Sequence, residues 1–162
     1  MTIVIDVTTE AVGWEQTPAA EATVRKVIEA ALADGEPGDC EIGVVLSDDA
    51  RICTLNRTWR GKDAATNVLS FPAGDTAEDG PRLLGDVVLA FETIAREAEA
   101  EGKTFDDHLA HLAVHGALHL LGFDHERGGD AEAMENQERK ILAQLGIGDP
   151  YAAAPVKRTE PA

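Results

Sequence analysis

The chain has 162 residues, of which 44% are hydrophobic, and its formal net charge is −16 at pH 7. This length and apolar content predict one compact domain with a sizeable core and argue against a second full domain. The negative charge argues against binding nucleic acid over the whole surface, because contacts with phosphates need a local excess of Lys and Arg. No apolar stretch is long enough to span a bilayer, and the N-terminal segment has no signal-peptide pattern. With two isolated cysteines, Cys40 and Cys53, these features indicate a cytoplasmic protein.

Strands and helices alternate in the first part of the chain, and helices follow one another in the last part. Alternating β-branched residues indicate strands, and apolar residues that recur every three or four positions indicate helices. In chain order, the patterns predict a strand at 2–7, a helix at 18–34, a strand at 41–47, a short helix at 48–59, strands at 67–72 and 83–92, and helices at 92–102, 105–122 and 129–146. The nearly continuous apolar run of the strand at 83–92 also predicts burial on both faces.

Together these elements predict an α/β (α+β) fold, with one domain over 1–146. We expect a mixed sheet of about four strands packed with about five helices. The segment 147–162 is rich in Gly, Pro and Ala, which is typical of a disordered tail. The order of the strands in the sheet does not follow from the sequence.

The predicted helix at 105–122 carries a stripe of four histidines spaced three or four residues apart: His108, His111, His115 and His119. His115 and His119 are one turn apart, so both imidazoles can bind one ion. Gly122 stands where the helix ends, and a chain reversal there would bring His125 to the same ion. Three imidazoles with an open fourth position are typical of a catalytic zinc site, whereas structural sites usually have four ligands and are rich in Cys. We therefore predict a metal site formed by His115, His119 and His125, and ordinary hydrogen-bonding roles for His108 and His111.

The segment HGALHLLGFDH (115–125) has the histidine spacing of the metzincin zinc proteases, but Gly116 stands where those enzymes have their catalytic glutamate. A peptidase needs a base and an acid to form and resolve its tetrahedral intermediate, so this glycine disfavours peptide hydrolysis. A peptidase whose base has moved to Asp124 or Glu126 is an alternative. Phosphodiester cleavage makes a different demand, because a metal together with an arginine or lysine stabilises its anionic transition state.

Basic residues are unevenly distributed in this acidic chain. Four of them lie close together in the segment RICTLNRTWRGK: Arg51, Arg57, Arg60 and Lys62. Acidic residues instead dominate 92–107 and 124–138. The cluster is either a solvated helix face or a local binding site for phosphate groups.

Three blocks, in this order, resemble the YbeY family of bacterial metal-dependent endoribonucleases: LNRTWRGKDAATNVLSFP (55–72), LLGDVVLA (83–90) and HGALHLLGFDH (115–125). The resemblance covers about residues 40–145. It implies that zinc is bound by His115, His119 and His125, that Arg60 is the characteristic arginine of the family, and that the substrate is the 16S rRNA precursor. Asn67 stands where the family frequently has aspartate, and asparagine cannot take up a proton at neutral pH.

We therefore expect a zinc-dependent, single-strand-specific endoribonuclease that acts in 16S rRNA 3′-end maturation and ribosome quality control. One Zn²⁺ per chain, or another divalent metal, would activate water or polarise the phosphate, and Arg60 would stabilise the transition state. Lys62 and Arg57 are further candidate phosphate contacts. The expected partners are RNA and the small ribosomal subunit, with no membrane and no DNA. The main alternative is a ribosome-biogenesis binding module whose metal only fixes the loop at 122–125.

Overall fold

The computed structural model describes residues 1–74, 80–123 and 128–152. This part of the chain holds a four-stranded mixed sheet in the order β1-β2-β4-β3, formed by β1 (Ile3–Thr9), β2 (Cys40–Ser47), β3 (Val68–Pro72) and β4 (Arg82–Ala90). Strands β1, β2 and β4 are parallel to one another, and β3 runs antiparallel to β4. Strand β3 therefore forms one edge of the sheet.

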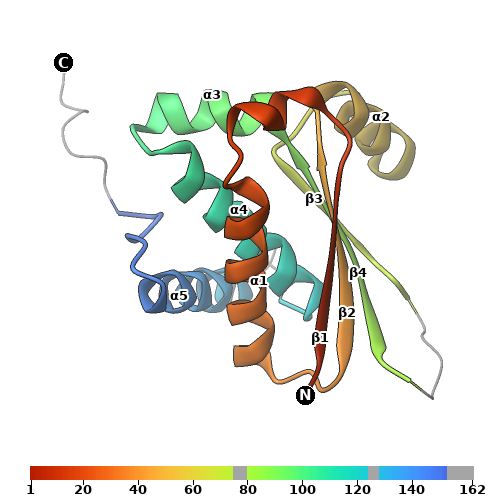
Figure 1. Ribbon diagram of the computed structural model, residues 1–162, viewed down its shortest axis with the longest axis vertical. Helices are drawn as coiled ribbons and strands as arrows, with labels where there is room; N and C mark the ends of the chain where they lie inside the picture. The colour runs from red at the N-terminus through yellow and green to blue at the C-terminus, as the bar shows by residue number, and fades with distance from the viewer. Residues whose placement is uncertain (75–79, 124–127, 153–162) are drawn as a thin grey trace.

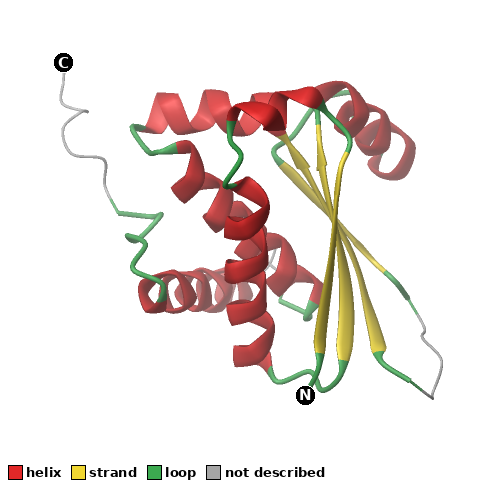
Figure 2. Cartoon of the chain, viewed as in Figure 1, coloured by secondary structure: helices red, strands yellow, loops and turns green. Residues whose placement is uncertain are grey.

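Five α-helices and one short 3-10 helix complete the described part of the chain: η1 (Val12–Gln16), α1 (Ala20–Gly35), α2 (Asp49–Arg60), α3 (Phe91–Glu101), α4 (Phe105–Leu120) and α5 (Gly128–Gln144). Helices α1 and α4 pack on one face of the sheet, and α2 packs on the other (Figure 1). Most of the helical mass thus lies on one side of the strands (Figure 2). The predicted single-domain α+β class, with about four strands and five helices, is confirmed.

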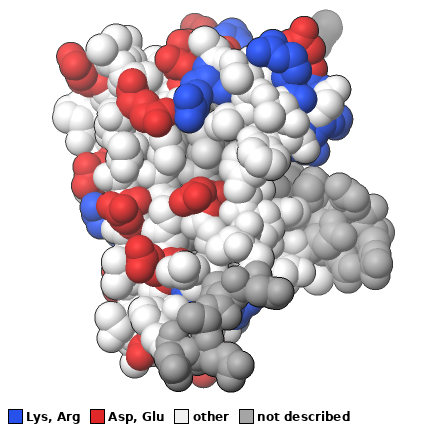
Figure 3. Space-filling model, turned by 90° about the vertical axis from the view of Figure 1, so that its right-hand side faces the viewer, with Lys and Arg blue, Asp and Glu red and all other residues white. Residues whose placement is uncertain are grey.

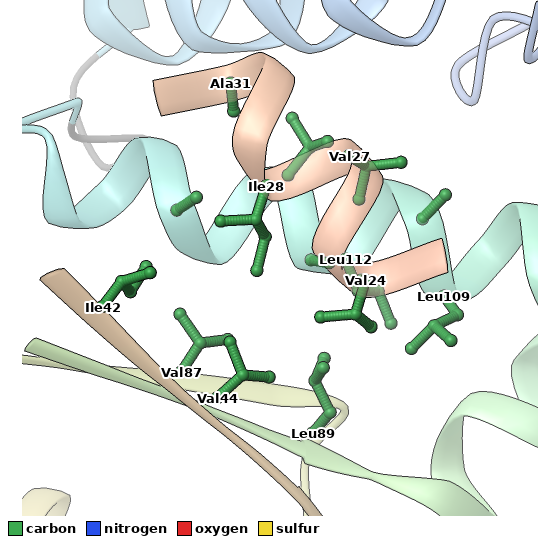
Figure 4. Packing of buried hydrophobic residues seen from close by; sticks show 14 of the residues in the cluster. Val24, Val27, Ile28, Ala31, Ile42, Val44, Val87, Leu89, Leu109 and Leu112 are labelled. Atoms are coloured by element: carbon green, nitrogen blue, oxygen red, sulfur yellow. The ribbon is translucent and has the colours of Figure 1, made fainter. Parts of the chain in front are cut away.

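The main core lies between α1, α4 and the sheet. Figure 4 shows side chains of α1 and α4 pointing toward those of β2 and β4, among them Val24, Ile28, Leu109, Ile42, Val44, Val87 and Leu89. A smaller cluster on the opposite face joins Val88 and Ala90 of β4 to Ile52 of α2. Alternate residues of β4 therefore enter different clusters, which confirms the predicted burial of this strand on both faces.

The sequence patterns missed η1 and placed the end of β4 too late. Strand β4 ends at Ala90, and Phe91 begins α3 instead of continuing the strand. The ring of Phe91 packs against Trp14 of η1, with 5.4 Å between the ring centroids, and against Phe105, with 5.2 Å. This aromatic cluster joins η1, α3 and α4, and such long-range contacts leave no mark in local periodicity.

Contacts with the domain continue past residue 146, where the predicted tail begins. Ile147 packs against the main core, and Lys103 Nζ donates a hydrogen bond of 3.0 Å to the carbonyl oxygen of Pro150. The remainder of the predicted tail, 153–162, lies outside the described residues. No helix within the described residues is long and apolar enough to cross a membrane.

Helix α4 approaches the sheet closely at Gly116. A Cβ atom added there would lie 2.8 Å from Val87 Cγ1 and 3.2 Å from Ser70 Oγ. The Ser70 hydroxyl also donates a hydrogen bond of 3.1 Å to the carbonyl oxygen of Gly116. Position 116 thus faces the sheet and leaves no space for a side chain, which explains why no glutamate follows the first histidine of the motif.

Replacing Gly116 by glutamate is expected to lower the free energy of unfolding by about 3 kcal/mol or more, because the new side chain overpacks the contact with Val87 and buries a carboxylate without a partner. Urea unfolding of the purified variant measures the loss. Gly148→Glu is the matched control, since a Cβ atom at Gly148 would have no neighbour within 4 Å in the part of the chain that the structure describes. Equal losses in the two variants would contradict the tight packing at Gly116.

Candidate active site

A cleft of about 650 Å³ opens along the edge strand β3. Arg60 and Lys62 line it from the end of α2 and the following loop, and His115 and His119 line it from α4. Three of the four predicted site residues, Arg60, His115 and His119, are therefore brought to one cleft from distant parts of the sequence. His125, the remaining predicted metal ligand, lies outside the described residues, as do Asp124 and Glu126.

The cationic wall of the cleft depends on a buried asparagine. Asn56 is 3% exposed, and its amide nitrogen donates a hydrogen bond of 2.9 Å to the carbonyl oxygen of Ala64. This bond fixes the loop that follows α2, while Gly61 ends the helix in the left-handed conformation. Arg57 pairs with Asp63 on the surface at 3.1 Å. Within the described residues, no ion pair involves Arg60 or Lys62, so both charges remain available to an anion.

The histidines that line the cleft rest on Glu138 of α5, a carboxylate that is fully buried. Its Oε1 accepts a hydrogen bond of 2.8 Å from His111 Nε2 and one of 2.5 Å from the Tyr151 hydroxyl, and its Oε2 accepts one of 2.7 Å from His115 Nδ1. Burial alone would raise the pKa of Glu138, but the hydrogen bonds from His111, His115 and Tyr151 outweigh it and lower the pKa to about 2. The carboxyl group is therefore ionised at neutral pH.

This carboxylate determines the tautomer of His115. An ionised carboxylate only accepts hydrogen bonds, so the proton of the His115 ring is on Nδ1, where it faces Glu138 Oε2. In the neutral ring the lone pair is then on Nε2. A histidine that donates one ring N–H to a carboxylate and binds a metal through the other nitrogen is a common arrangement in metal sites.

Tyr151 brings the C-terminal part of the described chain into the site. Its ring lies 5.1 Å from that of His111 between centroids, and the Arg139 guanidinium carbon lies 5.0 Å from the Tyr151 centroid. Asp149 accepts a hydrogen bond of 2.8 Å from the Tyr151 backbone N–H and one of 3.1 Å from Arg139 Nε. Burial and the hydrogen bond to Glu138 raise the pKa of the Tyr151 phenol, so it remains a donor to that carboxylate.

A second carboxylate-histidine pair lies beside the cleft. Glu97 Oε1 accepts hydrogen bonds from His108 Nε2 at 2.8 Å and from the Asn67 amide at 2.9 Å. His108 is 4% exposed, as expected for a structural histidine. Asn67 lines the cleft, and its amide can donate to Glu97, whereas an aspartate there would bring two carboxylates together. The asparagine thus suits this chain because Glu97 already occupies the neighbouring space.

The residues that could hold a metal are His115 and His119, whose side chains both line the cleft. Among residues 1–74, 80–123 and 128–152, no group of three or more His, Cys, Asp or Glu side chains is arranged to bind an ion. The third predicted ligand, His125, lies outside those ranges. No carboxylate within them lines the cleft either, so the wall is cationic and imidazole-rich.

Glu138 and Tyr151 were not predicted from the sequence as residues of the site. Met134, Ile141 and Leu142 form the buried stripe of α5, and Glu138 lies on the same stripe at helical spacing. A lone acidic residue at a core position is the signal that was available for Glu138. Tyr151 carried no such signal, because its segment has the composition of a tail. His111, for which an ordinary role was expected, lines the cleft and contacts both residues.

Comparison with known proteins places these features in a family context. A family model described as Endoribonuclease YbeY matches residues 5–146. A protein named Endoribonuclease YbeY from Rhodopseudomonas palustris (strain BisB18) is 57% identical over 145 residues, covering 86% of each chain. One of the same name from Bradyrhizobium diazoefficiens is 53% identical over 149 residues, covering 88% of this chain and 81% of the relative. The solution structure of TM1509 from Thermotoga maritima has a similar fold, with a TM-score of 0.53, 24% identity, and coverage of 96% of this chain and 100% of that one.

Because of Glu138, the free energy of unfolding is expected to decrease as the pH falls through the acid range. Since the pKa of Glu138 falls from 4.5 in the unfolded chain to about 2 in the fold, its stabilising contribution is complete above pH 4.5 and is lost as the pH falls toward 2. The shift corresponds to about 3 kcal/mol. Urea unfolding of the wild type and of Glu138→Gln at pH 7 and pH 3 isolates this contribution. The wild type should be the more stable at pH 7, with a smaller difference at pH 3, and an identical difference at both pH values would refute the assignment.

Proposed function

This chain belongs to the YbeY family of endoribonucleases, and from that premise we propose that it is a zinc-dependent enzyme that cleaves single-stranded RNA. The observation that carries the proposal is the composition of the cleft. In a protein with a net charge of −16, the described lining contains Arg60 and Lys62 and no carboxylate. Such a lining suits a phosphodiester and disfavours a peptidase site, which needs a carboxylate or an equivalent base.

The histidines fit a divalent metal. His115 and His119 are one turn apart on α4 and line the same cleft, and Glu138 selects the His115 tautomer with its lone pair on Nε2. Together with His125 they would provide three imidazoles, a ligand set that suits zinc and other divalent transition metals. When bound, the metal would supply Lewis-acid chemistry, either polarising a phosphoryl oxygen or lowering the pKa of a water molecule.

Arg60 and Lys62 would bind the substrate and stabilise charge. The guanidinium of Arg60 offers paired N–H donors to phosphate oxygens, and it lines the cleft without a competing carboxylate in the described residues. Negative charge on the phosphate oxygens grows in the transition state, so a donor fixed beside them lowers the barrier. Lys62 adds a second positive charge, whereas Arg57 is engaged by Asp63 and contributes less.

We further infer that the substrate is the 16S rRNA precursor, cleaved at its 3′ end, with a role in ribosome quality control and the small ribosomal subunit as partner. A cleft of about 650 Å³ is the size of a small-ligand pocket, which suits nucleotides of a flexible single strand and excludes a duplex. The acidic remainder of the protein repels RNA elsewhere. Activity on naked RNA should therefore be weak, and a ribosomal particle would supply the missing contacts.

A second candidate is a ribosome-biogenesis binding module whose metal only stabilises the loop after α4. The observation in its favour is that no carboxylate of the described residues lines the cleft as a general base, and that Asn67 cannot act as one. This candidate predicts binding to the particle without turnover.

Metal binding tests the histidine assignment. Equilibrium dialysis against zinc followed by elemental analysis should give one ion per chain for the wild type and strong loss of binding for His119→Ala, because one of three ligands is removed. His108→Gln is the control, since His108 pairs with Glu97 and does not line the described cleft. Circular dichroism confirms that both variants remain folded. Unchanged zinc content in His119→Ala would remove that residue from the site.

Cleavage of a 16S rRNA 3′ fragment within a 30S-like particle tests the catalytic assignment. Arg60→Ala is expected to reduce the rate by about 100-fold or more, the usual effect of removing a donor to a developing anion. Arg51→Ala is the matched control, because Arg51 is an exposed arginine of the same helix that does not line the cleft. Retained binding to the particle without cleavage by the wild type would favour the binding module, and equal rates for both variants would exclude Arg60 from catalysis.

A further inference from the structure

We propose that Trp59 forms a stacking site for a nucleobase of single-stranded RNA at the rim of the cleft. This inference rests on the proposed function and deepens it, because it assigns a base-binding position next to the phosphate-binding cations. The site would accept any base, since every nucleobase offers an aromatic face.

Trp59 is exposed to an unusual extent for a tryptophan. Its relative exposure is 69%, whereas the other tryptophan of the chain, Trp14, is 4% exposed and packs against Phe91 and Phe105. An indole side chain carries a large apolar area whose burial is normally favourable. Among the described residues, Trp59 belongs to neither core cluster, so its exposed ring is available to a ligand.

Trp59 lies on α2 between two residues that line the cleft. Asn56 and Arg60, one helical turn apart on α2, both line the cleft. Trp59 precedes Arg60 in the last turn, and one residue corresponds to a rotation of about 100° around the helix axis. Its side chain therefore emerges on the helix face that adjoins the cleft-lining face. The backbone is also held at this point, because Gly61 N–H donates to Arg57 O and Lys62 N–H donates to Asn56 O.

Charge around Trp59 favours a polyanion over an apolar protein segment. Arg57 and Arg60 lie on the same turn of α2 and Lys62 follows in the loop, and Figure 3 shows Lys and Arg side chains, with some Asp and Glu side chains among them, at the upper end of the face that carries α2. Aromatic side chains beside cations are the usual surface for single-stranded nucleic acid, where the bases stack and the phosphates pair with the charges. A strand whose phosphate contacts Arg60 would have a neighbouring base within reach of Trp59.

Two tryptophans with opposite exposure allow a direct test on the full-length chain. Titration with a short single-stranded RNA of mixed sequence should quench the tryptophan emission of the wild type. In Trp59→Phe the remaining emission comes from the buried Trp14 and should not respond. Binding is followed in parallel by the anisotropy of a labelled strand. Trp59→Leu, which keeps an apolar side chain without an aromatic face, should weaken binding at least about fivefold, the lower end of the contribution of one stacked base.

Further variants separate stacking from simple hydrophobic contact. Trp59→Phe retains a ring and should bind more tightly than Trp59→Leu, whereas Val12→Ala, at another exposed apolar residue, should bind as the wild type does. RNA binding with unchanged emission, or equal affinity of Trp59→Leu and wild type, would overturn the stacking site. If the stacking site is overturned in this way but Trp59→Leu cleaves the ribosomal particle at the wild-type rate, only the stacking site is lost and the proposed function stands. Absence of cleavage by the wild type would instead count against the proposed function itself.

Discussion

Glu138 carries a negative charge in the interior of the domain, where three hydrogen bonds from His111, His115 and Tyr151 hold it. Burying a carboxylate is costly unless such donors replace water, so the four side chains are stable only as a set. The set joins α4, α5 and the segment that follows α5. Because one of the donors is His115 Nδ1, the same interaction that secures the packing of these elements also sets the direction in which the ring presents its other nitrogen.

The distribution of charge at the cleft follows from where the carboxylates are placed. Glu138 and Glu97 both contact histidines of α4. Each carboxylate accepts a hydrogen bond from an imidazole, and neither lines the cleft. Arg60 and Lys62, by contrast, line the cleft. An acidic protein thus presents a locally cationic surface to an anionic substrate. The close approach of α4 to the sheet at Gly116 completes the arrangement, because it directs His115 and His119 outward while position 116 faces Val87.

Local periodicity predicted the four strands and five α-helices of the described residues but missed η1 and the end of β4, and the spacing of the histidine motif singled out His115 and His119, which line one cleft. Strand order was not predictable, because it depends on contacts between segments far apart in the sequence. The same limit applies to His111, whose role is set by Glu138 and Tyr151 from other elements. Glu138 itself has an acidic side chain that ordinarily faces water, and only its place on the apolar stripe of α5 distinguishes it.

The most direct test of this account is a crystal structure of the zinc-loaded protein, with anomalous diffraction recorded at the zinc absorption edge. The account predicts one zinc ion in the cleft, bound by His115 through Nε2, by His119 and by His125, with Glu138 still accepting the hydrogen bond from His115 Nδ1. A zinc ion bound elsewhere, or a His115 ring that has turned away from Glu138 to bind the metal through Nδ1, would contradict it.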